Sequence, residues 1–111
     1  MAVRLNRKLV LEAPVRVSDG AGGFDTQWRS LGVLWASVTL RTGRETASSG
    51  APISLTSYRI VVRGAPVGAL QRPKPEQRFR EGARVFIIQA VAEDDPNGRY
   101  LTCFATEETA V

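Results

Sequence analysis

The sequence contains no histidine and only one cysteine, Cys103, among its 111 residues. Without imidazole there is neither a histidine metal ligand nor a side chain suited to shuttling protons near neutral pH. A single thiol forms no internal disulfide and no thiolate zinc site. Cys103 also lacks the neighbouring base that a nucleophilic cysteine needs, so the sequence predicts a buried thiol. We expect no enzymatic activity, no metal and no other cofactor.

Lysine is also scarce, since Lys8 and Lys74 are the two lysines among 15 basic residues. The others are arginines, whose planar guanidinium groups pair with phosphate or carboxylate at interfaces. Long apolar runs are missing as well. No window approaches the roughly 20 apolar residues that span a bilayer, and the first residues lead into no apolar signal core. We therefore expect a cytoplasmic protein without membrane contact.

Hydrophobic residues make up 43% of the sequence and charged residues 23%. This balance is typical of one soluble globular domain spanning residues 1–111. The net charge of +4 is unevenly distributed, because residues 41–92 hold nine basic and three acidic residues, whereas residues 93–111 hold one basic and five acidic. A basic middle and an acidic end indicate either nucleic-acid binding or a basic surface that meets an acidic surface on a neighbouring subunit. Composition leaves both open.

The apolar residues follow the period of two that is typical of β-strands, and no stretch longer than about ten residues keeps a helical spacing. The strand candidates are residues 8–18, 24–40, 58–63, 83–92 and 99–105. Five or six strands at this spacing predict an all-β fold, a small barrel or sandwich.

The connections are marked by turn-forming residues. Residues 19–23 and 94–98 predict hairpin turns, because Gly and Asn tolerate positive φ. Residues 64–82 contain three prolines and predict an irregular connection with at most a short helical turn over 75–79. Residues 42–52 are polar, with two glycines and a proline, and predict one long flexible loop after the second strand. Such loops are usually functional or disordered, which makes this one a candidate functional segment.

Leu34, Ala36, Val38 and Leu40 alternate with polar or aromatic residues, which predicts that they face the core. Trp35 falls on the opposite face. The large apolar side chain of tryptophan is seldom left exposed to solvent, so Trp35 is expected at a barrel rim or at a contact between subunits.

Arg59 and Arg63 share one face of the third strand candidate, opposite Tyr58. The simplest interpretation is a solvated face. The alternative is a small barrel that binds single strands, in which basic residues are interleaved with exposed aromatic residues. The position of Tyr58 speaks against this alternative, because the basic and aromatic residues of this strand lie on opposite faces.

Several short motifs occur in a characteristic order. They are the Asp-Gly-Ala-Gly-Gly turn, Trp28, Trp35-Ala36-Ser37-Val38, Gly43-Arg44-Glu45, Tyr58-Arg59-Ile60-Val61-Val62-Arg63, Arg84-Val85-Phe86-Ile87-Ile88 with Val91, the Asp-Pro-Asn-Gly turn, Tyr100-Leu101-Thr102-Cys103 and the closing Glu107-Glu108. In this order the sequence resembles the phage head-tail joining proteins, the small head-closure or stopper subunits found in tailed phages, prophages and gene transfer agents. The resemblance covers nearly the whole chain, and no motif in it is a catalytic signature.

The resemblance implies a six-stranded β-barrel subunit without enzymatic activity. Such subunits form a homo-oligomeric ring, a hexamer or alternatively a dodecamer, between the portal and adaptor proteins on the head side and the tail-terminator protein on the tail side. Packaged double-stranded DNA passes through the ring, which seals and gates the channel. The protein would be in the host cytoplasm during assembly and then at the head–tail connector of the particle.

The resemblance also implies roles for two groups of residues. The loop expected to face the DNA channel comprises Arg41, Thr42, Gly43, Arg44, Glu45, Ser48, Ser49 and Gly50. The charge asymmetry, together with a ring whose subunits meet through two different surfaces, points to a second group at the interface between subunits or rings. This group comprises Trp35, Arg59, Arg63, Asp94, Asp95, Glu107 and Glu108.

Two alternatives stay open. The chain could occupy another position in the same connector, either as the adaptor or as the tail-completion ring. Adaptors of this kind are expected to be largely helical and tail-completion rings to be mixed α/β, and this sequence has no strong amphipathic helix. The alternative from a different class is the small single-strand-binding barrel, which would bind oligonucleotides tightly as an isolated subunit and in a salt-dependent manner.

Overall fold

The computed structural model describes residues 3–48, 51–93 and 95–110, without the side chains of residues 44–48, 51–53 and 110. The described part of the chain contains six strands and no helix, so it has no helix that could cross a membrane. The strands are β1 (Arg7–Ser18), β2 (Phe24–Ser48), β3 (Ala51–Arg63), β4 (Arg78–Glu81), β5 (Arg84–Glu93) and β6 (Tyr100–Ala110). The all-β prediction is confirmed.

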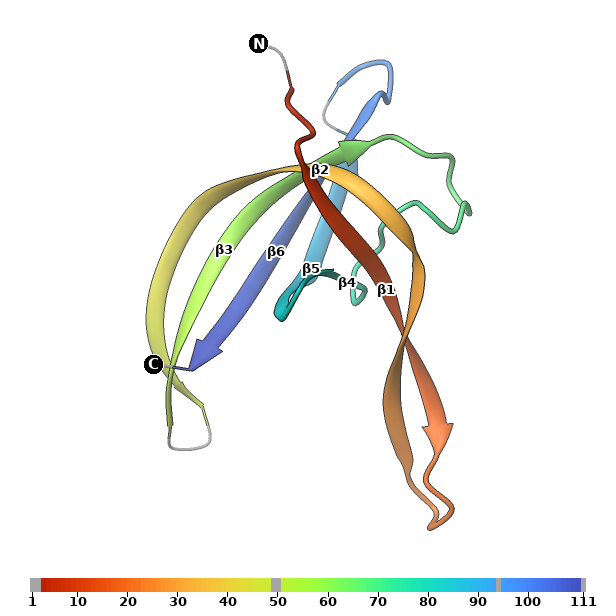
Figure 1. The fold of residues 1–111 in the computed structure, drawn as a ribbon, viewed down its shortest axis with the longest axis vertical. Helices are drawn as coiled ribbons and strands as arrows, with labels where there is room; N and C mark the ends of the chain where they lie inside the picture. Colours follow the sequence, from red (N-terminus) through yellow and green to blue (C-terminus); the bar gives the residue numbers. More distant parts are fainter. Residues whose placement is uncertain (1–2, 49–50, 94, 111) are drawn as a thin grey trace.

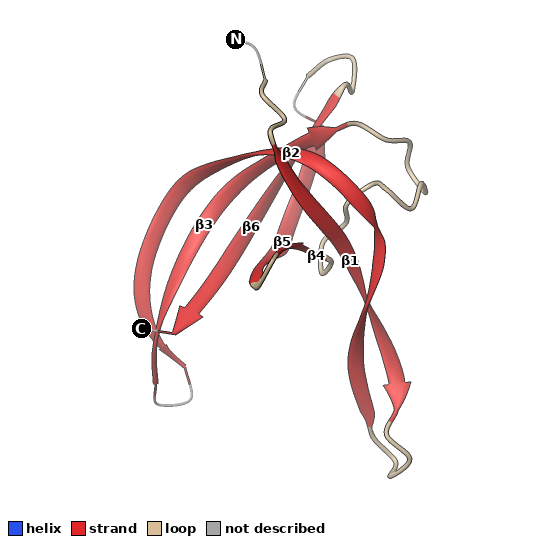
Figure 2. Cartoon of the chain, in the orientation of Figure 1, coloured by secondary structure: helices blue, strands red, loops and turns tan. Residues whose placement is uncertain are grey.

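All neighbouring strands are antiparallel and form one closed barrel in the order β1-β2-β3-β6-β5-β4 (Figures 1 and 2). The barrel closes where β4 pairs with β1. This seam is short, with three pairs of facing residues between Val10–Glu12 of β1 and Arg78–Arg80 of β4. The seam depends on side chains as well, because so few backbone pairs hold it.

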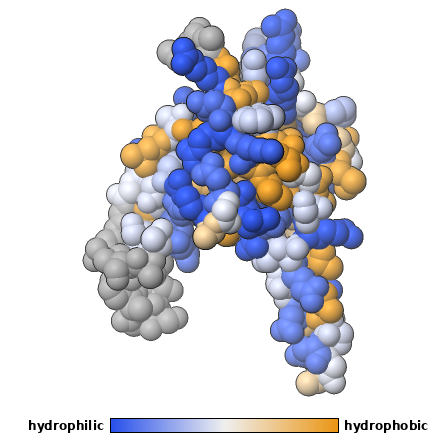
Figure 3. Space-filling model, viewed as in Figure 1, coloured by the Kyte–Doolittle hydropathy of each residue, from blue (hydrophilic) through white to orange (hydrophobic). Residues whose placement is uncertain are grey.

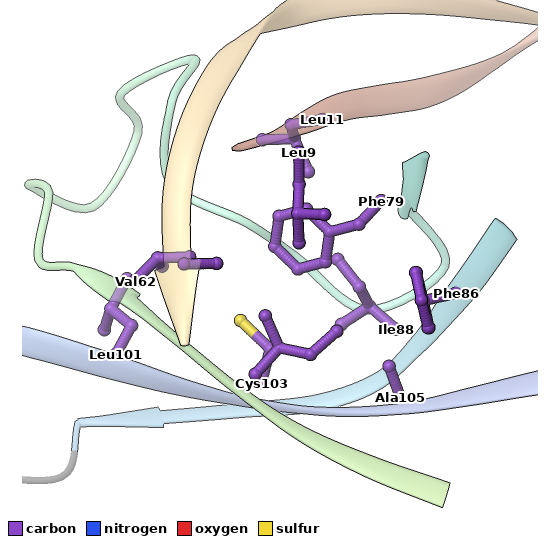
Figure 4. Close-up of a cluster of buried hydrophobic side chains, with 11 residues drawn as sticks. Leu9, Leu11, Val62, Phe79, Phe86, Ile88, Leu101, Cys103 and Ala105 are labelled. Atoms are coloured by element: carbon purple, nitrogen blue, oxygen red, sulfur yellow. The ribbon is translucent and has the colours of Figure 1, made fainter. Parts of the chain in front are cut away.

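Apolar side chains from all six strands fill the inside of the barrel and form the core, and the buried residue from β2 is Ala36 (Figure 4). Leu9 and Leu11 of β1 lie next to Phe79 of β4, and Ile88 of β5 and Cys103 of β6 belong to the same cluster. The fully or almost fully buried residues are Leu9, Leu11, Ala36, Ile60, Val62, Phe79, Phe86, Ile88, Leu101, Cys103 and Ala105. The predicted buried state of Cys103 is thereby confirmed.

β2 is much longer than the barrel is tall, and it takes part in two projecting arms (Figure 1). The first, which we call the hairpin arm, consists of residues 13–30 from β1, β2 and their turn. It begins at a β-bulge where Leu11 faces Gly32 and Glu12 faces Ser30. Gly32 has a φ of 141°, which side chains rarely allow, so a glycine is needed for β2 to bend out of the barrel at this point.

The second arm corrects the prediction of a loop over residues 42–52. In the structure β2 continues to Ser48 and β3 starts at Ala51, and Thr42 to Ser48 pair in order with Ser57 to Ala51. None of the described side chains of this extension belongs to the core cluster, and the sequence shows no apolar alternation there. Backbone pairing with β3 forms the strand here, and backbone pairing leaves no pattern in the sequence. We call residues 42–57 the β2–β3 arm.

Three smaller expectations are also corrected. The connection over residues 64–82 includes a strand, β4, and the predicted helical turn over 75–79 is not formed. Instead Glu76 takes a positive φ of 75°, and its backbone N–H donates to the carbonyl of Ile88. Leu40, expected in the core, is exposed, because β1 begins opposite Ala36 and does not cover β2 beyond that point.

Candidate functional site

A basic and aromatic cluster lies on the outer face of the barrel at the base of the β2–β3 arm. Arg59 of β3 is directly opposite Phe104 of β6, so both side chains are on the same face. The guanidinium of Arg41 lies 4.7 Å from the centre of the Phe104 ring. Arg41 is the extra residue of a second bulge in β2, which brings it onto this face. Both arginines are exposed and make no ion pair with a described residue.

The residues expected to face a DNA channel form one contiguous segment that starts at this cluster. Arg41, Thr42 and Gly43 are exposed on β2. The backbones of Arg44, Glu45 and Ser48 follow in the β2–β3 arm, and the predicted residues Ser49 and Gly50 lie outside the described residues. The structure therefore presents the described part of this segment as a projecting strand rather than as a loop.

The acidic pair at the end of the chain is split between the two faces of β6. Glu107 faces Thr56 and shares the inner face with Tyr58, whereas Glu108 faces Leu55 and is exposed on the outer face. Glu107 accepts hydrogen bonds from Arg84, at 2.8 Å from Nε and 2.9 Å from Nη2, and from the Tyr58 hydroxyl at 3.3 Å. Glu107 is therefore engaged within its own chain, and Glu108 is the residue free to meet another surface.

Ion pairs at this end of the barrel shift the pKa values of several side chains. The hydrogen bonds from Arg84 hold the pKa of Glu107 below its ordinary value, although burial opposes this shift. The same contacts raise the pKa of Arg84. Next to them, Glu81 binds Arg7 of β1 through two hydrogen bonds of 2.9 and 2.5 Å, which lower the pKa of Glu81. These pairs join β1 to the end of β4 and the start of β5 to β6.

A buried carboxylate reinforces the short seam of the barrel. Glu12 of β1 is 6% exposed and accepts hydrogen bonds from Arg78 at 2.7 Å and Arg80 at 3.0 Å, both on β4. Burial alone would raise the pKa of Glu12, but the two guanidinium groups outweigh it, and the pKa lies below its ordinary value. Arg78 also stacks over Trp28 of the hairpin arm, 4.1 Å from the ring centre. The arm is thus tied to the barrel wall.

The remaining acidic candidates belong to the β5–β6 turn. Asp95 is half-buried, and its carboxylate accepts a hydrogen bond from the backbone N–H of Tyr100 at 3.1 Å, which is turn chemistry. Asp94 lies outside the described residues. Glu93, at the end of β5, is 3.7 Å from Arg72. Part of the acidic end therefore neutralises the basic middle within one chain.

Trp35 and Arg63 lie together at the other end of the molecule from the β2–β3 arm. Trp35 is 54% exposed, on the face opposite the buried Ala36, as the alternation predicts. Trp35 and Arg63 line two neighbouring hollows at the end of β3. The structure brings these two interface candidates together and separates them from Glu107 and Glu108 (Figure 1).

Sequence reasoning missed Phe104 and Glu12. Phe104 joins the arginines only because β6 pairs with β3, a contact between residues 45 positions apart. Glu12 meets β4 across the barrel seam, and Arg78-Phe79-Arg80 is the one local signal, because alternating arginines around a buried apolar residue put two cations on one face. Within the described ranges, no cluster of three or more side chains suited to metal binding is present.

Comparisons with known proteins agree over almost the whole chain. Residues 1–108 match the family described as phage head completion protein. Among solved structures, the chain is similar to one in the structure titled "Virion of native gene transfer agent (GTA) particle". The two sequences are 55% identical, the TM-score is 0.90, and the match covers 99% of this chain and 100% of the other. No curated protein matches.

Proposed function

The chain belongs to the phage head completion protein family, and we propose on this basis that it forms the head-closure, or stopper, ring between the portal and adaptor proteins and the tail of a phage-like particle. The observation that carries the proposal is the 55% identity over 99% of the chain to a component of a gene transfer agent virion. The ring is proposed as a hexamer, with a dodecamer as the alternative. The subunit would be made in the host cytoplasm and then built into the particle.

In the proposed ring the β2–β3 arm faces the channel for double-stranded DNA and helps to close it. The arm projects from the barrel and none of its described side chains belongs to the core cluster, so it can change position without disturbing the fold (Figure 1). Arg41 at its base is exposed and without a carboxylate partner among the described residues. Six copies with a net charge of +4 each would carry about +24, an ample attraction for a polyanion.

Shortening the β2–β3 arm, with the pairing of its remaining residues kept, tests whether the arm closes the DNA channel. Glu45 and Ser54 face one another across β2 and β3, so replacing residues 46–53 by Asn-Gly leaves a two-residue hairpin turn. We expect the variant to melt like the parent chain and to let DNA leak from filled heads. If heads that contain the shortened chain keep their DNA as well as unmodified heads, the gating role is wrong.

A matched pair of variants tests the DNA contact of Arg41. Arg41→Ala should weaken DNA retention in particles, whereas Arg29→Ala removes the same charge from an exposed position on the hairpin arm and should have little effect. Equal retention in both variants would remove Arg41 from the proposed channel surface.

In the proposed ring, Trp35, Arg59, Arg63 and Glu108 supply contacts to neighbouring subunits or rings. Asp94 is part of the same proposal as a residue of the β5–β6 turn, and Asp95 and Glu107 support the interface from within their own chain. Glu108→Lys is expected to reduce incorporation into particles without lowering the melting temperature. Thr109→Lys adds a lysine at the adjacent exposed position, on the opposite face of β6, and is expected to incorporate normally.

A single-strand-binding barrel is the second candidate, and the cluster of Arg41, Phe104 and Arg59 favours it. β6 supplies the aromatic ring that β3 lacks on this face. Titration of the isolated chain with a labelled oligonucleotide at low and high salt separates the two functions. Tight, salt-sensitive binding supports the second candidate. Weak binding at both salt concentrations supports the ring.

A further inference from the structure

An apolar groove beside Trp35 is open on the surface of the barrel. It has a volume of about 330 Å³ and is lined by Val33, Leu34 and Trp35 of β2, by Arg63 with the two residues after it, and by Gln71. Val33 and Trp35 are each at least half exposed. Apolar side chains grouped around a hollow on a small monomer are typical of a surface that another group covers.

The groove has one charged wall. Arg63 is exposed, and none of the ion pairs or side-chain hydrogen bonds among the described residues involves its guanidinium. An apolar hollow with a free cation at its edge is complementary to an apolar side chain that is followed or preceded by a carboxylate.

The chain itself carries such a segment at the tip of the hairpin arm. The large hydrophobic residues exposed in the described part of the chain are Val3, Phe24, Val33, Trp35, Leu40, Val67 and Leu70. Phe24 is the one among them with an acidic neighbour in sequence, Asp25. Phe24 is 59% exposed, with one contact from Arg16 at 4.3 Å from the ring centre. Asp25 is exposed and takes part in none of the ion pairs found between described residues.

The tip of the arm and the groove of the same chain are far apart. Phe24 pairs with Ser18 at the end of the arm, whereas Trp35 pairs with Lys8 near the start of β1. Eleven positions along β2 separate them, or about 36 Å at the rise of an extended strand. The arm points away from the barrel, and its surface in Figure 3 carries hydrophobic as well as hydrophilic residues along its length. Contact between tip and groove therefore requires two copies of the chain.

We propose that the hairpin-arm tip of one copy docks in the Trp35 groove of the next copy, with the Phe24 ring in the hollow and the Asp25 carboxylate paired with Arg63. The contact joins two different surfaces, which is the type of interface that a ring of identical subunits uses. The inference rests on the proposed head-closure ring and adds to it the pair of surfaces that hold neighbouring subunits together.

Disulfide trapping in assembled particles tests this contact. Asp25→Cys combined with Arg63→Cys places one thiol on each surface, and the buried Cys103 does not compete. The control combines Asp25→Cys with Lys74→Cys, which is exposed in the connection between β3 and β4 and does not line the groove. After oxidation of purified particles, we expect a non-reducing gel to show a ladder of covalent oligomers for the first pair and monomer for the control.

Each other outcome overturns the inference in a recognisable way. Equal ladders for both pairs would mean non-specific collision. Monomer alone from particles that contain the chain would exclude the contact and leave the ring proposal standing. A bond between the single variant Arg63→Cys and another protein of the particle would show that the groove belongs to a different partner. If the unmodified chain is absent from particles, the proposed function fails, and this inference fails with it.

Charge exchange supplies a second readout. Asp25→Arg and Arg63→Asp should each lower incorporation into particles by about tenfold, as expected for the loss of a close interfacial charge pair. The double variant should recover to within about twofold of the parent chain. Both positions are exposed, so each variant is first shown to melt like the parent. Failure of the double variant to recover would overturn the ion pair.

Discussion

At the scale of single residues, the most consequential side chain is Glu12. It is a carboxylate that the barrel wall buries, and the two arginines that neutralise it lie on the strand that closes the barrel. Removing one partner of a buried ion pair costs much more than removing an exposed charge, because the remaining groups stay desolvated without compensation. The short β1–β4 seam should therefore depend on this side chain.

We predict that Glu12→Gln lowers the free energy of unfolding by about 3 kcal/mol. Urea denaturation at pH 7 measures the change. Glu108→Gln is the control, because Glu108 is exposed and forms none of the ion pairs seen among described residues, and it should stay within about 0.5 kcal/mol of the parent. A Glu12→Gln variant as stable as that control would show that the backbone pairs alone hold the seam.

The single thiol gives a second prediction at this scale. Burial raises the pKa of Cys103 to about 12, so at pH 8 the thiol is both protonated and inaccessible. A thiol-specific chromogenic reagent should react with the unfolded chain in urea and not measurably with the native chain over the same minutes. Rapid reaction of the native chain would contradict the position of Cys103 in the core.

At the scale of elements, glycines allow the strands and connections to approach closely. The backbone N–H of Gly64, just after β3, donates to the carbonyl of Arg99 at 2.7 Å, and any Cβ at position 64 would collide with the carbonyl oxygen of Gly98. A side chain there would push apart the end of β3 and the start of β6.

We expect Gly64→Ala to destabilise the fold by about 2 kcal/mol, the usual cost of forcing an extra methyl group into a tight contact. Gly43→Ala is the matched control, because a Cβ at that position would have only ordinary contacts of 3.9 Å. Thermal melts of both variants compare the two effects. Equal melting temperatures would show that the backbone around Gly64 yields more easily than the structure indicates.

The sequence predicts those elements in which one face is buried. Alternation identifies the barrel part of β2, the end of β3 and most of β5 and β6, because each contributes side chains to the core. It gives no signal for the β2–β3 arm, where none of the described side chains belongs to the core. β4 is missed because it has four residues within a connection rich in proline. The exposed arginines are apparent in the sequence, whereas their aromatic partner Phe104 depends on strand order, which is a property of the whole fold.

At the scale of the whole molecule, arginine–carboxylate pairs bind the barrel together at several places. Glu12, Glu81 and Glu107 each have a pKa below the ordinary value of 4.5 because of arginine hydrogen bonds. Between the folded and the unfolded pKa the unfolded chain binds more protons, so stability falls as the pH falls. The contribution of these pairs is complete above about pH 4.5 and is lost below it.

Urea midpoints at about pH 7, 5.5 and 3 test this prediction. We expect similar midpoints at the two higher pH values and a clearly lower midpoint at about pH 3. In Glu12→Gln the drop between the highest and the lowest pH should be smaller, because one of the three carboxylates no longer titrates. A midpoint that is unchanged across this range would contradict a stabilising role for the three pairs.

We propose that this subunit completes the head, so that the head keeps its DNA and joins the tail. The decisive experiment is to delete its coding sequence from a host that makes the particles and to examine the lysate by electron microscopy. We expect heads without attached tails and a loss of retained DNA, both reversed when the chain is supplied from a plasmid. Tailed, DNA-filled particles in normal number from the deletion strain would contradict it.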